Sequence, residues 1–244
     1  MRLSALLAAT ANLSVRQREA MLGLMERHYA GVERDLFERD LAEKPWVILI
    51  SDAASGELCG FSTQMLLDVE AAGRPIKALF SGDTIIDQQH WGDQALAHAW
   101  GRLALSLIDS HPDAEFYWFL ISQGYKTYRF LPVFFHEFYP RHEAPVPRWA
   151  QTAIDALAFA RAPHDYDPGT GVIRAGSRQY RLRKGLADVT PERLRDDHVR
   201  FFRECNPGHE RGDELCCLAP LTRANFTPAA WRVIGPEPVA LVVS

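Results

Sequence analysis

The chain has 244 residues, of which 47% are hydrophobic and 24% charged, and its formal net charge is -4. This composition is typical of a globular protein with one large domain or two small ones. The chain lacks the overall basic excess that nucleic acids and anionic membranes attract, so neither is an expected partner. Its apolar runs are all shorter than the roughly 20 residues that span a bilayer.

The cysteines give no sign of a metal site or a disulfide framework. They are Cys59, Cys205, Cys216 and Cys217, which lack C-x-x-C spacing and lie among apolar residues. We therefore expect packed, reduced thiols in a cytoplasmic protein that holds no metal. The short apolar run at the N-terminus is interrupted by alanines and leads into helix-capping residues, so we do not expect it to be a secretion signal.

Two helices are expected before the first clear strand. Ser14 and Gln17 have the spacing of a capping box, which predicts a helix that continues to about Ala30. Apolar residues at helical spacing predict a second helix over Val32 to Leu41. It ends before Pro45, because the residue preceding a proline disfavours helical angles.

The next segment combines a strand, a polar turn and a strongly periodic helix. A hairpin of Trp46 to Ser51 and Leu58 to Val69 comes first, followed by a strand from Ile76 to Ile86 that Gly82 and Asp83 interrupt. The helix then runs from Ala95 to about Ser110. Backbone N–H groups at the start of such a helix can hold a phosphate or pyrophosphate, so the sequence predicts an anion-binding turn here.

The remaining elements are less regular. An aromatic-rich helix contains Pro132, which must bend or end it. In chain order the expected elements are a strand at Phe116 to Ser122, that aromatic helix at Tyr125 to Phe135, a strand at His136 to Tyr139, a helix at Trp149 to Ala160, a helix capped at Thr190, and a last buried strand at Leu215 to Leu221.

The order of elements over about Met1 to Arg141 resembles the GCN5-related N-acetyltransferase (GNAT) superfamily. The resemblance implies an α/β fold with a mixed, mostly antiparallel twisted sheet flanked by helices. It also implies an acyl-CoA-binding core at residues 1–141. Residues 142–244 would then form an extension, as an insertion or an extra lobe, with helices and a final sheet strand near 215–221.

The GNAT resemblance assigns the turn to the pyrophosphate of acetyl-CoA or another acyl-CoA. The family pattern is Arg/Gln-x-x-Gly-x-Gly/Ala, and here Gln94 follows Gln89 and Gly92 where a small residue is usual. Aligning Trp91 and Gly92 with the family's Arg-Gly pair leaves the arginine missing. The cofactor-binding residues that the resemblance indicates are Ile85, Ile86, Gln89, Trp91, Gly92, Asp93, Gln94, Ala95 and Ser122.

Two residues are the candidates for catalysis. The resemblance places a tyrosine that protonates the leaving thiolate at about Tyr128, although this residue also fits as a packing aromatic. Asp83 could accept the amine proton, or a bulge at Gly82 could turn it toward solvent or a backbone amide. Histidine is a common general base, so His90 and His136 are further candidates, but they also fit as hydrogen-bonded or surface histidines.

The predicted function is an acyl-CoA-dependent N-acyltransferase in which a small-molecule amine attacks the thioester directly. One alternative uses a long-chain donor carried by CoA or by acyl carrier protein, and another is a catalytically inactive GNAT-like binding or regulatory module. We also consider a homodimer.

Overall fold

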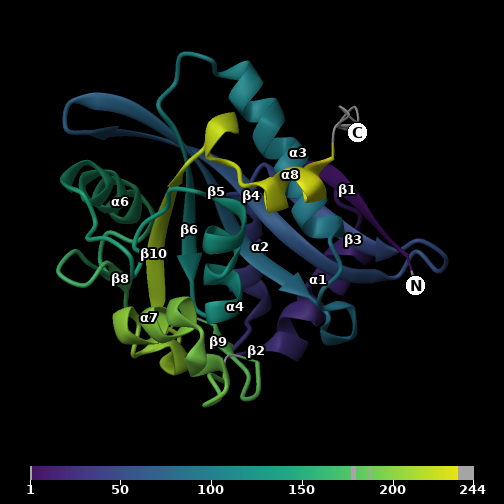
Figure 1. Ribbon diagram of the computed structural model, residues 1–244. Coiled ribbons are helices and arrows are strands. Elements are labelled where there is room, and N and C mark those ends of the chain that lie inside the picture. Colours follow the sequence, from purple (N-terminus) through teal and green to yellow (C-terminus); the bar gives the residue numbers. More distant parts are fainter. Residues whose placement is uncertain (1, 177–179, 187, 236–244) are drawn as a thin grey trace.

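The protein is built on one eight-stranded sheet, and the computed structural model describes residues 2–176, 180–186 and 188–235. The strand order is β1, β3, β4, β5, β6, β10, β8 and β7 (Figure 1). Neighbouring strands are antiparallel except for β5 and β6, which are parallel. The bounds are β1 Leu3–Ala9, β3 Trp46–Asp52, β4 Leu58–Ala71, β5 Arg74–Ile86, β6 Phe116–Ser122, β7 Tyr166–Asp167, β8 Val172–Ile173 and β10 Glu214–Pro220. The mixed, mostly antiparallel sheet confirms the predicted fold class.

Helices cover both faces of this sheet, and Figure 1 views it from the side of α3, α4 and α8. Leu79 and Trp118 pack in the apolar cluster of that side, whereas their chain neighbours Phe80 and Phe119 pack with α6 on the other side, next to α1 and α2. This alternation follows from the two-residue period of a strand. The helices are α1 Val15–His28, α2 Arg34–Ala42, α3 Ala95–Ser110, α4 Tyr125–Tyr128, α5 Phe130–Phe134, α6 Arg148–Arg161, α7 Asp197–Cys205 and α8 Pro228–Ile234.

The N-terminal residues form a strand that the sequence analysis missed. Leu3–Ala9 pairs antiparallel with β3, from Leu3 opposite Asp52 to Ala9 opposite Trp46. The expectation that two helices precede the first strand is therefore wrong. An edge strand whose partner lies some forty residues away leaves only a weak local pattern, because tertiary pairing supplies its hydrogen bonds.

Several predicted elements of the first half are confirmed. Helix α1 begins with the expected capping box, in which Ser14 Oγ accepts from Gln17 N at 3.2 Å and Gln17 Oε1 accepts from Ser14 N at 2.8 Å. The aromatic segment, however, is split into α4 and α5 at Arg129. Pro132 explains the break, because its ring would clash with the Tyr128 carbonyl in a continuous helix.

Two predictions in later segments are corrected. His136 to Tyr139 is not a strand and forms only a single bridge, from Tyr139 to Leu218. Helix α7 begins at Asp196 rather than near Thr190, because the Asp196 carboxylate accepts from the N–H groups of His198 and Val199 at 3.0 and 3.3 Å.

The predicted last strand is confirmed as β10. It lies beside β6, with Leu215 opposite Ser122 and Pro220 opposite Tyr117. A small separate sheet pairs β2 (Tyr29–Ala30) with β9 (Arg181–Leu182). Within the described residues, no helix combines the length and the apolar character that crossing a membrane requires.

Candidate active site

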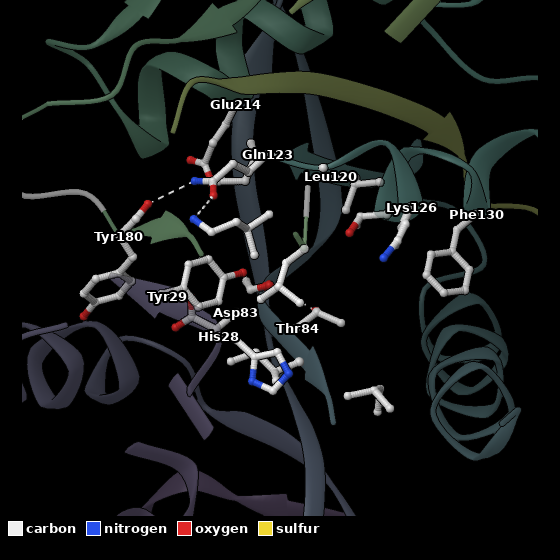
Figure 2. Close-up of a pocket in the computed structure, with 18 of the residues that line it drawn as sticks. His28, Tyr29, Asp83, Thr84, Leu120, Gln123, Lys126, Phe130, Tyr180 and Glu214 are labelled. Atoms are coloured by element: carbon white, nitrogen blue, oxygen red, sulfur yellow. Dashed lines mark hydrogen bonds between the residues drawn. The ribbon is translucent and has the colours of Figure 1, made fainter. Parts of the chain in front are cut away.

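Strands β5 and β6 separate partway along the sheet. They pair from Lys77 opposite Phe116 to Ser81 opposite Leu120, and β5 then continues to Ile86 paired with β4 but no longer with β6. A cavity of about 570 Å³ lies at this opening and is lined from both faces of the sheet (Figure 2). Helices α1, α2 and α6 contribute residues on one face, and α3, α4 and α5 on the other. The opening thus gives two molecules access to each other through the sheet.

A β-bulge directs Asp83 into this cavity. Ser62 pairs with Thr84 and Gln64 with Ser81, so the single residue Thr63 faces both Gly82 and Asp83. A Cβ atom at Gly82 would lie 2.6 Å from Thr63 Oγ1 and 2.9 Å from Lys44 Cε, which explains the glycine. The bulge predicted at Gly82 is therefore present. It turns Asp83 toward the cavity rather than toward bulk solvent.

Asp83 lies within a cluster of charged side chains. Its carboxyl group lies close enough to that of Asp40 for the two to interact electrostatically. Asp40 forms ion pairs with Lys44, whose side chain is 2% exposed, and with Arg161, at 3.4 Å between Oδ1 and Nη2. Glu214, from the start of β10, lines the same cavity. Four separate elements thus bring these groups together.

The surroundings of the two cavity carboxyls disfavour their ionised forms. Burial, assisted by Asp40, raises the pKa of Asp83 to about 7, although Lys44 and Arg161 act against this shift. Burial, assisted by Asp83 and Asp40, raises the pKa of Glu214 to about 8. A carboxyl with a pKa near 7 can release and accept protons at neutral pH, as a general base must.

The predicted cofactor turn lies at the other end of the cavity. Trp91, Gly92 and Asp93 line it together with Ile85 and Ile86. Trp91 Nε1 donates to the Ile86 carbonyl at 2.9 Å, and its ring carries Lys126 Nζ 3.4 Å from the centroid. Gly92 has φ +97°, a conformation that favours glycine.

The start of α3 only partly resembles an empty anion site. Asp93 Oδ1 accepts from Ala95 N at 2.7 Å, so a carboxylate already satisfies one N–H group of the first turn. Leu96 and Ala97, which line the cavity, carry the next two N–H groups. Gln89, Gln94, Ala95 and Ser122 are not among the cavity-lining residues.

The structure does not bring Tyr128 to the cavity. Its side chain is fully buried between Phe138 and Phe202, and its hydroxyl donates to the Pro140 carbonyl at 2.9 Å. Burial raises the pKa of Tyr128 far above its usual value. Neighbours on the same segment, Lys126 and Thr127, face the cavity instead.

No family model matches the sequence, and a search of curated proteins found no match. Among solved structures, a probable N-acyltransferase from Enterococcus faecalis V583 is 11% identical to this chain, with a TM-score of 0.43. The match covers 57% of this chain and 33% of the E. faecalis chain. A GNAT-family N-acetyltransferase from Escherichia coli in complex with CoA is 18% identical, with a TM-score of 0.36. The match covers 53% of this chain and 69% of the E. coli chain. A GCN5-related N-acetyltransferase from Kribbella flavida is 10% identical, with a TM-score of 0.41. The match covers 56% of this chain and 34% of the K. flavida chain. The chain spans about a third of the length of the first and third. This likeness concerns the fold.

Two histidines line the cavity, and sequence reasoning singled out only one of them. His90 is 8% exposed and His28, at the end of α1, is 7% exposed. Nδ1 of His28 lies 2.9 Å from the Leu24 carbonyl oxygen. Among the described residues, neither Nε2 atom has a hydrogen-bond partner. His136, the other candidate base, does not line the cavity.

Gln123 holds together the wall of the cavity that the last third of the chain provides. Its Nε2 donates to the carbonyls of Tyr180 and Gly212 at 3.0 and 3.3 Å, and its Oε1 accepts from Leu182 N at 2.7 Å (Figure 2). Gln123 directly follows the strand predicted at Phe116 to Ser122. The sequence alone does not show that the segments which Gln123 joins lie side by side.

A small apolar cavity of about 60 Å³ adjoins the large one. Leu96, Ala97, Leu120 and Phe130 line both cavities, and α8 closes the smaller one with Ile234. We call this smaller space the side cavity.

One group of side chains outside both cavities has potential metal ligands. His142, Glu143 and His198 bring one ligand atom each within 4.8 Å of one another. Glu143 Oε1 lies 3.3 Å from His142 Nε2 and 3.7 Å from His198 Nε2, so the same side chains also suit ion pairs with protonated histidines. His142 and Glu143 are exposed. This group therefore does not belong to the candidate active site.

Proposed function

We propose that the protein is an acyl-CoA-dependent N-acyltransferase in which an amine attacks the thioester in the opening between β5 and β6. The observation that carries this proposal is the position of Asp83. A bulge aims its carboxyl group into the opening, and its pKa of about 7 suits proton transfer from an amine. The donor would enter from the α3 side and the acceptor from the α2 and α6 side.

The reaction balances with Asp83 as the base. The bound ammonium gives one proton to the Asp83 carboxylate, which passes it to solvent. The neutral nitrogen then forms a bond to the thioester carbon, and the carbon–sulfur bond breaks. The second nitrogen-bound proton moves through Asp83 to the departing thiolate. The products are an amide, free CoA thiol and one released proton, and Tyr128 takes no part.

Several features of the α3 side support a donor with phosphate groups. The N–H groups of Leu96 and Ala97 and the positive end of the α3 dipole can hold a pyrophosphate. Lys126 adds a cation at the same place. Beyond Ser81 and Leu120, backbone groups of β5 that no longer face β6 could hydrogen-bond the amides of the pantetheine arm.

A longer acyl group is the second candidate for the donor. The side cavity favours it, because it is lined by apolar side chains and joined to the main cavity at Leu96 and Leu120. Profiling acetyl-CoA against butanoyl-CoA, hexanoyl-CoA and acyl carrier protein would separate the two donors.

Two measurements test the proposal. Acyl-CoA at about 100 times its Kd should stabilise the fold by roughly 2.7 kcal/mol and raise the Tm. Mixing protein, acyl-CoA and a panel of amines should release CoA thiol in proportion to amide formed. No Tm shift and no thiol release with any donor would overturn the proposal. A Tm shift without thiol release would favour an inactive GNAT-like binding module.

A further inference from the structure

Two cations of the main cavity, on the side of Asp83, already have partners. Lys44 pairs with the Asp40 carboxylate and also donates to the Asp40 carbonyl at 3.0 Å. Arg161 pairs with Asp40 and, at 2.8 Å, with Glu43. Two cations and two carboxylates thus form a local ion-pair network that is neutral when all four are ionised. Asp83 and Glu214 stay outside it.

Asp83 and Glu214 face the same space, and among the described residues neither forms an ion pair, although Lys44 and Arg161 act on both. Both residues line the cavity. Burial raises the pKa of the Tyr29 hydroxyl, and Asp83 and Glu214 both raise it further. Figure 2 shows Tyr29 and Asp83 close together, with Glu214 farther along the same wall. A ligand that lies along this wall can contact both carboxyl groups.

His28 adds an acceptor to the same space. The Leu24 carbonyl oxygen only accepts hydrogen bonds, so Nδ1 of His28 must carry the proton. In the neutral ring, Nε2 then presents a lone pair. This atom is buried and has no partner within the described parts of the chain, and His28 lines the same cavity as Asp83 and Thr84 (Figure 2). A buried acceptor of this kind favours a ligand that donates hydrogen bonds.

We propose that the acceptor of the acyl group is a diamine, with its reacting nitrogen between Asp83 and His28 and its second nitrogen bound to Glu214 as an ammonium. This inference rests on the proposed function. A diamine supplies the donors that these three groups lack, and its two charges oppose those of the two carboxylates. A monoamine supplies no hydrogen-bond donor to the Glu214 carboxyl group, whereas the second ammonium of a diamine does.

The test compares acceptors of one length. With acetyl-CoA or the best donor, 1,4-diaminobutane should have a kcat/KM about tenfold or more above that of butylamine, because a charged hydrogen bond contributes about 1.5–3 kcal/mol. The compound 4-aminobutanoate, which carries a carboxylate at its far end, should react more slowly than butylamine. Equal rates for diaminobutane and butylamine, or a preference for aminobutanoate, would overturn the inference.

Glu214 variants locate the second nitrogen. Glu214→Gln should reduce the ratio of diaminobutane to butylamine kcat/KM about tenfold, whereas Glu214→Asp should keep part of the ratio. Glu210→Gln, at an exposed position nearby in the chain, is the matched control and should keep all of it. If Glu214→Gln does not fold, Glu214→Asp still decides, because an unchanged ratio in that variant contradicts the assignment.

A binding measurement separates this inference from the proposed function. Without any acyl-CoA, diaminobutane at millimolar concentration should raise the Tm of the protein more than butylamine does. This result would support the diamine site even if no thiol were released. Thiol release with butylamine as good an acceptor as diaminobutane would support the acyltransferase and contradict the diamine.

Discussion

The carboxyl group of Asp40 lies beside that of Asp83 at the point where β5 bulges, and it raises the pKa of Asp83. Two carboxylates at short range repel each other, so a proton on Asp83 relieves this repulsion. Lys44 and Arg161 form their ion pairs with Asp40. Asp83 therefore holds its proton more strongly than an ordinary aspartate does, and it becomes a base when that proton leaves.

Asp83→Asn should remove the base without removing the donor site. We expect kcat/KM to fall roughly a hundred- to ten-thousandfold, the usual contribution of general acid–base catalysis. Calorimetry should find acyl-CoA affinity within about twofold of the wild type, since Asp83 lies away from Trp91 and Lys126. Asp113→Asn, an exposed turn residue, is the control. Retained activity in Asp83→Asn would show that another group takes the amine proton.

The pH dependence of activity should report the same group. Below about pH 7 Asp83 keeps its proton, so kcat/KM should rise with pH and level off above an apparent pKa near 7. Burial is the main cause of this value, Asp40 raises it further, and Lys44 and Arg161 lower it. In Asp83→Asn this rise should disappear from the residual rate. The same rise in both proteins would assign it to the amine or another residue.

Stability should change with pH in the direction set by raised carboxyl pKa values. The folded pKa values of Asp83 and Glu214, about 7 and about 8, exceed the ordinary values of 3.8 and 4.5. The folded state therefore binds more protons than the unfolded state between about pH 4 and pH 8, and the free energy of unfolding falls as pH rises through this range. Urea unfolding at pH 5 and pH 8.5 measures the fall, which should be smaller in Asp83→Asn. An equal fall in both proteins would contradict this assignment.

Gly82→Ala should destabilise the bulge. The new methyl group would lie too close to Thr63 Oγ1 and Lys44 Cε, so we expect a loss of about 1–3 kcal/mol in the free energy of unfolding. Gly23→Ala is the matched control, because a Cβ there meets only Arg27 Nη1 at 3.6 Å within helix α1. That control should be stabilised by up to about 1 kcal/mol. Equal stability of the two variants would mean that Lys44 and Thr63 move aside at no cost.

Lys126→Gln tests the donor end of the cavity. Lys126 lies over Trp91, and burial together with Arg193 lowers the pKa of its ammonium group, although Asp188 acts against this shift. We expect acyl-CoA affinity to fall about two- to fivefold, and more at low salt, because exposed ion pairs are weak and screened. Lys77→Gln, at the far end of β5, is the control. Unchanged affinity at low salt would remove Lys126 from the donor site.

Ala97→Leu tests the side cavity. Ala97 lines both cavities, so a larger side chain there narrows their junction. We expect kcat/KM for hexanoyl-CoA to fall more than kcat/KM for acetyl-CoA, which serves as the internal control. An equal fall for the two donors would mean that the acyl group does not enter the side cavity.

Local patterns predicted one wall of the site well. The strand before Ile86, the bulge at Gly82 and the helix from Ala95 follow from the spacing of apolar residues and the position of the glycine within one segment. The resemblance to GNAT proteins placed the cofactor turn after that strand. The division of the chain near residue 141 stays a prediction.

The opposite wall could not be predicted from the sequence. Asp40 and Arg161 lie more than a hundred residues apart in the sequence, and Glu214 lies farther along the chain. Only the folded sheet brings all three to Asp83. Each is an ordinary charged residue in its own segment. The position of Tyr128 away from the cavity also depends on tertiary structure. Pro132 breaks the helix after Tyr128, and the ring of Phe202 packs against the Tyr128 ring.

The most direct test of the central claim is a crystal structure of the protein with bound CoA. The account predicts that the pantetheine arm lies between β5 and β6 beyond Ser81 and Leu120, with the pyrophosphate at the start of α3 and the sulfur beside Asp83. CoA bound elsewhere, or with its sulfur pointing away from Asp83, would contradict the account.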